Sequence, residues 1–129
     1  MFTVEQIEIA NLKVKSGADF PLYIAEIKKI GVLKFETWVK DSRTIYFGEN
    51  FETESSPKYD KLHINSNVTV PVFINQLKSH QKGETDYFTF CKDCANNGIE
   101  KWIVCLDKMT CIYFDINGNE ILVETIPTL

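Results

Sequence analysis

The sequence predicts an α+β fold made of two tandem ααβββ repeats, related by a pseudo-two-fold, with antiparallel strands packed against helices. Three observations predict it: helical apolar periodicity followed by β-rich stretches, the return of that order in the second half, and helix-capping residues at equal places in both halves. With 129 residues, of which 44% are hydrophobic, the chain is long enough to form a single domain with one shared core.

The first repeat spans about residues 3–55. Its first helix begins at a capping box, "TVEQ", and continues to about Lys15. A second helix is capped by Asp19, carries a proline in its first turn and ends at Gly31. The β-rich stretches "VLKFETWVK" and "TIYFG" predict a hairpin, and "NFETE" predicts a third strand.

The second repeat spans about residues 70–126 and follows an irregular connector, residues 56–69, in which residues 62–64 are predicted as one short strand. Two helices are predicted over "PVFINQLKSHQKG" and "DYFTFCKDCANNG". The stretches "IEKWIVCL" and "CIYFDI" predict a second hairpin. Asn117-Gly118 predicts a type I′ turn into the strand "NEILVETI".

A constant offset of 67 positions relates the two repeats without a gap from residue 3 to residue 47. The helix cap Asp19 corresponds to Asp86, and the closing glycine Gly31 corresponds to Gly98. Chance would give roughly three identities over this length. The sequence has eight, namely Ile7/Ile74, Lys15/Lys82, Asp19/Asp86, Gly31/Gly98, Lys34/Lys101, Ile45/Ile112, Tyr46/Tyr113 and Phe47/Phe114.

This offset also interprets the Cys-x-x-Cys pair of Cys91 and Cys94. The two cysteines align with Ile24 and Ile27, which lie on the apolar stripe of the second helix, so we expect two small core residues. A reactive thiol pair and a metal site are the alternatives. Zinc is disfavoured because the other two cysteines lie on predicted strands, and a redox pair is disfavoured because the motif lies in mid-helix.

Composition and charge exclude several partners. The net charge is −4, with 18 acidic and 14 basic residues interleaved along the chain, so no basic face for nucleic acid is expected. No apolar run is long enough for a membrane span, and the N-terminal stretch does not resemble a signal peptide. Four cysteines without an export signal predict free thiols in the cytoplasm. No cofactor is predicted.

The predicted hairpins are apolar on both faces. One face carries Phe35, Val39, Tyr46, Trp102, Val104, Leu106 and Tyr113, and the other carries Trp38, Ile45, Phe47, Ile103, Cys105, Ile112 and Phe114. Helices can cover only one face, so the other needs the second repeat's sheet, a partner chain or a ligand. We favour packing within the chain, with a homodimer contact as the alternative.

No stretch of the sequence predicts a catalytic or metal site. His80 and Cys91 are a conceivable nucleophile pair, and Asp19 and Asp86 are conceivable paired carboxylates, but structural roles explain all four residues. We therefore favour a small, non-enzymatic binding or interaction protein. The alternative is a small-molecule-binding or enzymatic cleft between the repeats, lined by the aromatic residues Tyr23, Phe35, Tyr46, Tyr87, Trp102 and Tyr113.

The stretches "KSGADFP", "SSPKY", "GETDYFTFCKD", "EKWIVCLDKMTC" and "GNEILVETIP" carry a family resemblance over nearly the whole chain. The chain resembles an uncharacterised bacterial domain-of-unknown-function family, some of whose members are labelled phage envelope protein. The resemblance implies a prophage connection for some members. It implies no activity and no catalytic residue.

Overall fold

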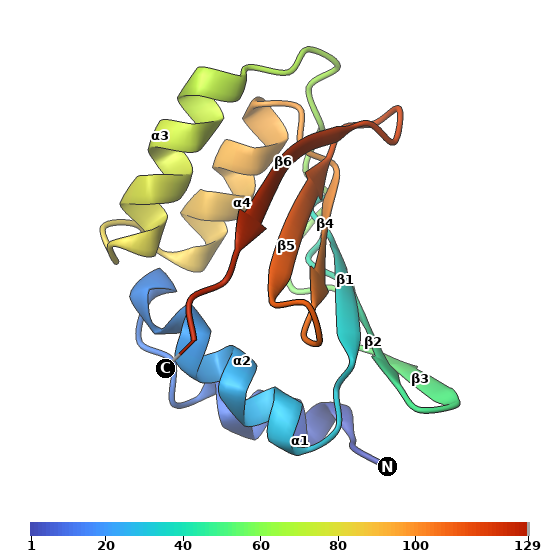
Figure 1. Ribbon diagram of the computed structural model, residues 1–129. Coiled ribbons are helices and arrows are strands. Elements are labelled where there is room, and N and C mark those ends of the chain that lie inside the picture. The colour runs from blue at the N-terminus through green and yellow to red at the C-terminus, as the bar shows by residue number, and fades with distance from the viewer. Residues whose placement is uncertain (129) are drawn as a thin grey trace.

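The computed structural model describes residues 1–128 and has two pairs of helices on one side of a single sheet (Figure 1). The helices are α1 (Val4–Asn11), α2 (Phe20–Lys29), α3 (Val70–Gln81) and α4 (Tyr87–Asn96), with a short 3₁₀ helix, η1 (Gly17–Asp19), before α2. The strands are β1 (Lys34–Trp38), β2 (Thr44–Gly48), β3 (Phe51–Glu54), β4 (Lys101–Cys105), β5 (Thr110–Phe114) and β6 (Glu120–Thr125). The predicted α+β class is confirmed.

All six strands form one antiparallel sheet in the order β3-β2-β1-β4-β5-β6. Each half of the chain therefore supplies three neighbouring strands, and the first strands of the two halves pair at the centre. The strands of the second half extend the sheet of the first half edge to edge and do not form a second layer stacked on that sheet.

The two halves have the same local geometry at the offset of 67. The bounds of α4 and β4 are those of α2 and β1 moved by that offset, and at the centre of the sheet Glu36 lies opposite Ile103, its own equivalent. Gly31 and Gly98 both have positive φ, 104° and 83°. These equalities support two related copies, although the common origin of the halves stays a prediction.

Hydrogen bonds across the centre follow the same symmetry. The amide of Val39 donates to the carbonyl of Glu100 at 2.9 Å, and the amide of Leu106 donates to the carbonyl of Leu33 at 3.0 Å. Each bond maps onto the other when the halves are exchanged. The central pairing is therefore held from both ends by equivalent contacts.

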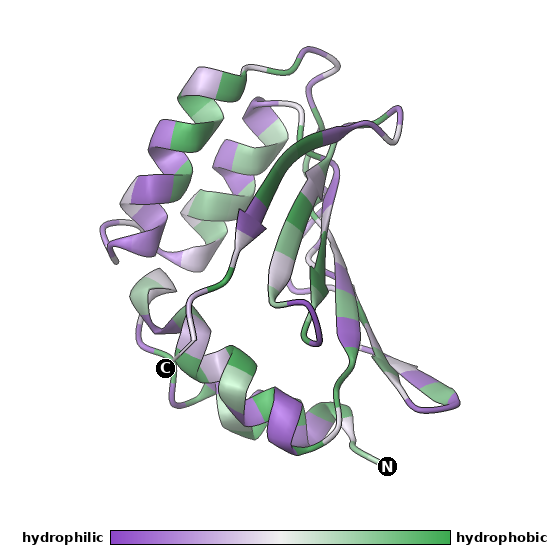
Figure 2. Cartoon of the chain, viewed as in Figure 1, coloured by the Kyte–Doolittle hydropathy of each residue, from purple (hydrophilic) through white to green (hydrophobic). Residues whose placement is uncertain are grey.

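One face of the sheet lies against the helices and forms the core. Along β1, β2, β4 and β5, alternate residues are buried, as a strand with one covered face requires. The helices alternate hydrophobic and hydrophilic segments, with one side of each turned to the sheet (Figure 2). The residues that are fully buried on this side include Ile24, Ile27, Val39, Phe73, Ile99 and Val104.

Local expectations needed correction at three places. The first helix ends at Asn11, not near Lys15, because the amides of Lys13 and Val14 bond three residues back, to Ala10 and Asn11, and no longer four. Residues 62–64 form no strand, because the Leu62 amide pairs with the Lys40 carbonyl in a single isolated bond. The turn at Asn117-Gly118 is not type I′, because only the glycine has positive φ.

An Asp side chain explains the last of these corrections. The Asp115 carboxylate accepts hydrogen bonds from the amides of Asn117 and Asn119, both at 2.9 Å. These bonds organise a longer turn around one acidic side chain, and a bulge follows where β5 pairs with β6. The third strand of the second half is therefore displaced relative to β3.

Candidate functional site

A cluster of buried hydroxyl groups lies in the first hairpin. The Oγ1 atoms of Thr37 and Thr44 are 2.9 Å apart, and the Thr44 amide donates to Oγ of Ser55 at 3.0 Å. Ser42 is fully buried, and its carbonyl accepts from the Thr44 hydroxyl at 3.1 Å. Buried polar groups need partners, and these residues supply them to one another.

The second hairpin has no such cluster at the equivalent positions. Val104 replaces Thr37, Cys111 replaces Thr44 and Met109 replaces Ser42. Ser42 and Met109 both have left-handed backbones, with φ of 65° and 52°. The left-handed backbone therefore belongs to the shared turn, while the polar side chains belong to the first half alone.

Two tyrosines from other elements close over this cluster. The Tyr87 hydroxyl, at the start of α4, lies 2.6 Å from Oγ of Ser42. The Tyr59 hydroxyl, in the connector, donates to the carbonyl of Val39. Although 40% of Tyr87 is exposed, its hydroxyl is buried, and burial raises its pKa well above the ordinary value. Burial also raises the pKa of Tyr59.

Cys91 lies beside these two tyrosines. Burial raises the pKa of its thiol, and the neighbouring hydroxyl groups of Tyr59 and Tyr87 offset part of that rise. A thiol held in its neutral form is a poor nucleophile, because the thiolate is the reactive species. The arrangement can therefore donate and accept hydrogen bonds, and it does not activate an attacking group.

The cysteines occupy the slots that the repeat predicts. Cys91 and Cys94 are fully buried, like Ile24 and Ile27 in the first half, so the core interpretation is confirmed. Burial raises the pKa of Cys94 well above its ordinary value and that of Cys111 to about 12. Within residues 1–128, no three His, Cys, Asp or Glu side chains gather where they could hold a metal ion.

The six aromatic residues predicted to line a cleft divide into two packed groups. Tyr23, Phe35 and Tyr46 pack together beneath α2, and Tyr87, Trp102 and Tyr113 pack together beneath α4. Phe35, Tyr46, Trp102 and Tyr113 are buried core residues, and Tyr23 is partly buried. This packing is what core residues show, and the ligand role of the set stays a prediction.

The two other residue pairs considered for chemistry have structural roles. The His80 ring stacks on Phe90 at 4.4 Å between centroids, with Nδ1 at 3.2 Å from the Thr85 carbonyl oxygen, while Cys91 faces the tyrosines. Asp86 caps α4 by accepting from the Thr89 amide at 2.7 Å.

Asp19 differs from the cap that the sequence predicts. Its carboxylate accepts the Lys15 amide at 2.9 Å and makes no side-chain capping bond to α2. The reason is η1, which turns the chain just before α2 and directs this carboxylate back to the preceding segment. The two aspartates therefore differ in backbone as well as in side-chain contacts, with ψ of 8° at Asp19 and 172° at Asp86.

The sheet face away from the helices is a second candidate site, which we call the outer face. Its central row runs across the sheet as Glu54, Ile45, Glu36, Ile103, Ile112 and Val123. No helix or second sheet within residues 1–128 covers it (Figure 1), so the prediction that the chain itself covers both faces is wrong. The physical reason is the pairing of β1 with β4, which uses the second hairpin to widen the sheet.

Long basic side chains partly shield the aromatic residues of the outer face. Lys34 Nζ lies 4.7 Å from the ring centroid of Phe47, and Lys101 Nζ lies 4.8 Å from that of Trp38 and 5.3 Å from that of Phe114. Lys101 also pairs with Glu36 at 3.0 Å. The aliphatic stems and cation–π contacts reduce the exposed apolar area without closing the face.

Sequence reasoning missed several residues of the first site. Ser42, Ser55 and Tyr59 were not singled out, whereas Tyr87 and Cys91 were. One signal was present: two consecutive aromatic residues, Tyr87 and Phe88, follow the cap of α4, although only one can face the core. The Ser42–Tyr87 contact joins positions 45 residues apart, so the sequence contains no local sign of it.

Fold and site together define an α+β domain with one six-stranded sheet and helices on one of its faces. The chain belongs to the family described as "Protein of unknown function (DUF1398)", whose profile matches residues 8–125. No curated protein matches the chain. In the described part of the chain, no helix is both long and apolar enough to cross a membrane.

Proposed function

We propose that the protein is a non-enzymatic interaction module that binds a second copy of itself through the outer face. One observation carries the proposal: an apolar row, Ile103, Ile112 and Val123, crosses three neighbouring strands on a face that no described element covers. Val123 is 54% exposed, and β6 is hydrophobic through its middle (Figure 2). Contiguous apolar surface of this kind marks interaction sites.

The charges on the outer face favour a second copy as the partner. A two-fold contact places the same surface on both sides, so that surface must be self-complementary. The outer face carries both signs around its apolar row, with Lys34 near the centre and Glu52 at the β3 edge. Lys101 and Glu54 are already paired within the chain, with Glu36 at 3.0 Å and Arg43 at 2.8 Å. Two copies can then place acid against base, whereas a strongly charged partner would leave one sign unpaired.

The buried groups support the non-enzymatic part of the proposal. The tyrosine hydroxyls and the Cys91 thiol near Ser42 are all held in their neutral forms by burial. Four free thiols support a reducing bacterial cytoplasm, and neither nucleic acid nor membrane is a partner in this proposal. The proposal includes the prophage connection that the family resemblance implies.

Sedimentation equilibrium over a range of protein concentrations tests the proposal. We expect the average mass to rise from 14.9 kDa towards twice that value. Val123→Glu places a charge in the apolar row and should keep the protein monomeric over the same range, since burying an unpaired charge is strongly unfavourable.

Leu12→Glu is the matched control, because Leu12, the residue just after α1, is 83% exposed and lies outside the outer face. It makes the same apolar-to-acid change and should leave the dimer intact. A wild-type protein that stays monomeric at every concentration would overturn the proposal. So would a Val123→Glu variant that dimerises as well as wild type.

A further inference from the structure

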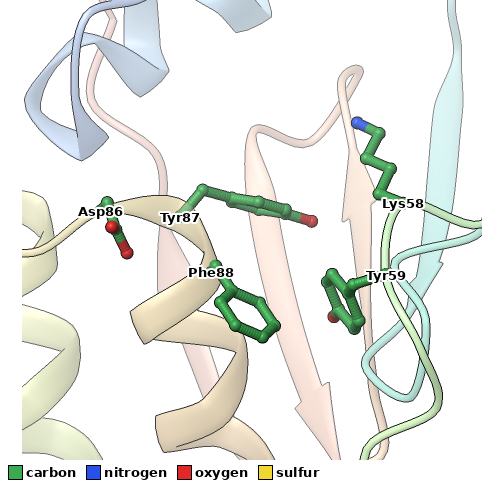
Figure 3. A pocket seen from close by; sticks show the side chains of 5 residues that line it. All are labelled: Lys58, Tyr59, Asp86, Tyr87 and Phe88. Atoms are coloured by element: carbon green, nitrogen blue, oxygen red, sulfur yellow. The ribbon is translucent and has the colours of Figure 1, made fainter.

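A shallow surface depression of about 490 Å³ lies between the start of α4 and the connector. Figure 3 shows its lining: Lys58 and Tyr59 from the connector face Tyr87 and Phe88 from α4, with Asp86 at the far edge. Tyr87 and Phe88 are 40% and 43% exposed. Phe88 packs on Tyr59 with ring centroids 5.0 Å apart, so the depression is lined by a continuous aromatic surface that stays partly open to water.

The two tyrosine rings are fixed in place before any ligand arrives. The Tyr87 hydroxyl bonds to Ser42 at 2.6 Å, and the Trp102 ring packs edge-on against Tyr87 with centroids 6.4 Å apart. The Tyr59 hydroxyl is bonded to the Val39 carbonyl. Rings that are already ordered lose little conformational entropy on binding, so a flat ligand gains most of the contact energy.

The charges around the depression select among flat ligands. Lys58 Nζ lies 5.7 Å from the Tyr87 ring centroid, and Lys92 Nζ lies 4.9 Å from that of Phe88. The Asp86 carboxylate is the opposing charge, and it is engaged with the Thr89 amide at 2.7 Å, at the edge away from Lys58. The Lys58 side of the depression is therefore basic, and the Asp86 side is acidic but already bonded.

We propose that this depression binds a small planar aromatic molecule that carries one anionic group. The aromatic ring lies over Tyr87 and against the edges of Tyr59 and Phe88, and the anionic group pairs with Lys58. The site is separate from the outer face, because it is built from the connector and α4 on the helix side of the sheet. It does not depend on self-association.

Titration of the intact protein with naphthalene-2-carboxylate, followed by ¹H–¹⁵N NMR, tests the site. We expect saturable shifts at the amides of Tyr87, Phe88 and Thr89 and at the indole N–H of Trp102. The neutral amide, naphthalene-2-carboxamide, should bind about tenfold more weakly, because it lacks the charge-assisted contact with Lys58. Absence of saturable shifts at these groups would overturn the proposal.

Two exposed side chains separate the contributions of charge and ring. Lys58→Gln should weaken binding of the carboxylate about tenfold and leave binding of the amide unchanged. Phe88→Ala should weaken binding of both about fivefold, because it removes one aromatic wall. Lys58 is exposed, so thermal unfolding of Lys58→Gln should match wild type. Phe88→Ala also removes the ring that packs on Tyr59 with centroids 5.0 Å apart, so its unfolding temperature should fall slightly while the fold is kept.

Lys61→Gln is the matched control, since Lys61 is another exposed connector lysine outside the lining of the depression. It should change neither affinity. Equal loss for Lys58→Gln and Lys61→Gln would overturn the assignment of the anion to Lys58, and so would equal affinity of the carboxylate and the amide. NMR shifts confined to outer-face residues would place the ligand on the other surface and would overturn the proposed site.

The Val123→Glu variant should bind the carboxylate as tightly as wild type does, because the depression does not include the outer face. This result keeps the test independent of the dimer.

Discussion

The two hairpins β1–β2 and β4–β5 have the same backbone and different chemistry. In each, the first strand pairs with the second in the same register, with Phe35 opposite Tyr46 and Trp102 opposite Tyr113. Yet the first hairpin buries a hydroxyl cluster around Ser42, while the second buries Val104 and Cys111. The comparison teaches that register and turn geometry are shared properties of the two halves, whereas the candidate site arises from side chains that only one half has.

The outer faces of the hairpins differ in the same way. Lys34 and Lys101 are equivalent and each covers an equivalent phenylalanine, Phe47 or Phe114. At the centre, however, the first half has Glu36 where the second has Ile103. This exchange replaces an ion-paired carboxylate by an apolar side chain, so the apolar row Ile103, Ile112 and Val123 lies on the second half.

The largest expected effect compares equivalent buried residues of α2 and α4, and it distinguishes a packing role of the Cys94 side chain from a chemical role of its thiol. Ile27 and Cys94 are equivalent and both fully buried. Ile27→Ala should lower the free energy of unfolding by about 3 kcal/mol, because it removes several methyl and methylene groups and leaves a cavity. Cys94→Ala removes one atom and should cost about 1 kcal/mol. Urea denaturation measures both, and a larger loss for Cys94→Ala would show that its thiol does more than fill space.

The next effect is a difference in stability loss between alanine substitutions at the two closing glycines, Gly31 and Gly98. A Cβ at Gly98 would lie 2.7 Å from the Asn67 carbonyl oxygen, whereas at Gly31 the nearest atom is a Phe2 ring carbon at 4.0 Å. Gly31→Ala should cost about 1 kcal/mol from the left-handed backbone alone. Gly98→Ala should cost about 2 kcal/mol or more, because the connector backbone must also move. Equal midpoints in urea would contradict the close approach of the connector to Gly98.

A smaller effect tests the polar contact that only the first hairpin makes. Ser42→Ala and Tyr87→Phe should each lower the free energy of unfolding by about 1 kcal/mol, because each leaves a buried hydroxyl without its partner. The double variant should cost less than the sum, since both partners are then removed. Additive losses in the double-mutant cycle would show that the two hydroxyls do not interact.

The smallest effect concerns the junction between the helix pairs, where His80 meets Gly17 of η1. Burial lowers the pKa of His80 below 6.5, while Asp86, Asp93 and the Thr85 carbonyl raise it in part. The unfolded chain therefore takes up this proton at a higher pH than the folded chain. The contribution of neutral His80 to the free energy of unfolding should be fully present above about pH 6.5 and should be lost as the pH falls below it.

His80→Gln removes this titration and provides the control. Its stability should be flatter between pH 7 and pH 5.5 than that of wild type, as measured by urea unfolding at several pH values. A wild-type protein that becomes more stable as the pH falls through this range would reverse the expected sign.

Much of the fold was predictable because the signals are local. The capping box at Thr3, the proline in the first turn of α2, the closing glycines and the alternating strands each depend on neighbours within a few positions. The burial of Cys91 and Cys94 was predictable because an internal copy showed which positions face the core. Asp19 and the Asn117-Gly118 turn were less predictable, since η1 and the Asp115 side chain redirect the chain there.

By itself the sequence determined the order of helices and strands, the faces they bury and the absence of a visible catalytic motif, because propensity, capping and periodicity act over short spans of chain. Only the tertiary structure decided that β1 pairs with β4, that no element among residues 1–128 covers the outer face, and that Tyr87 reaches Ser42. Strand partners and contacts between distant side chains depend on which surfaces meet when the core forms, and no local pattern records that choice.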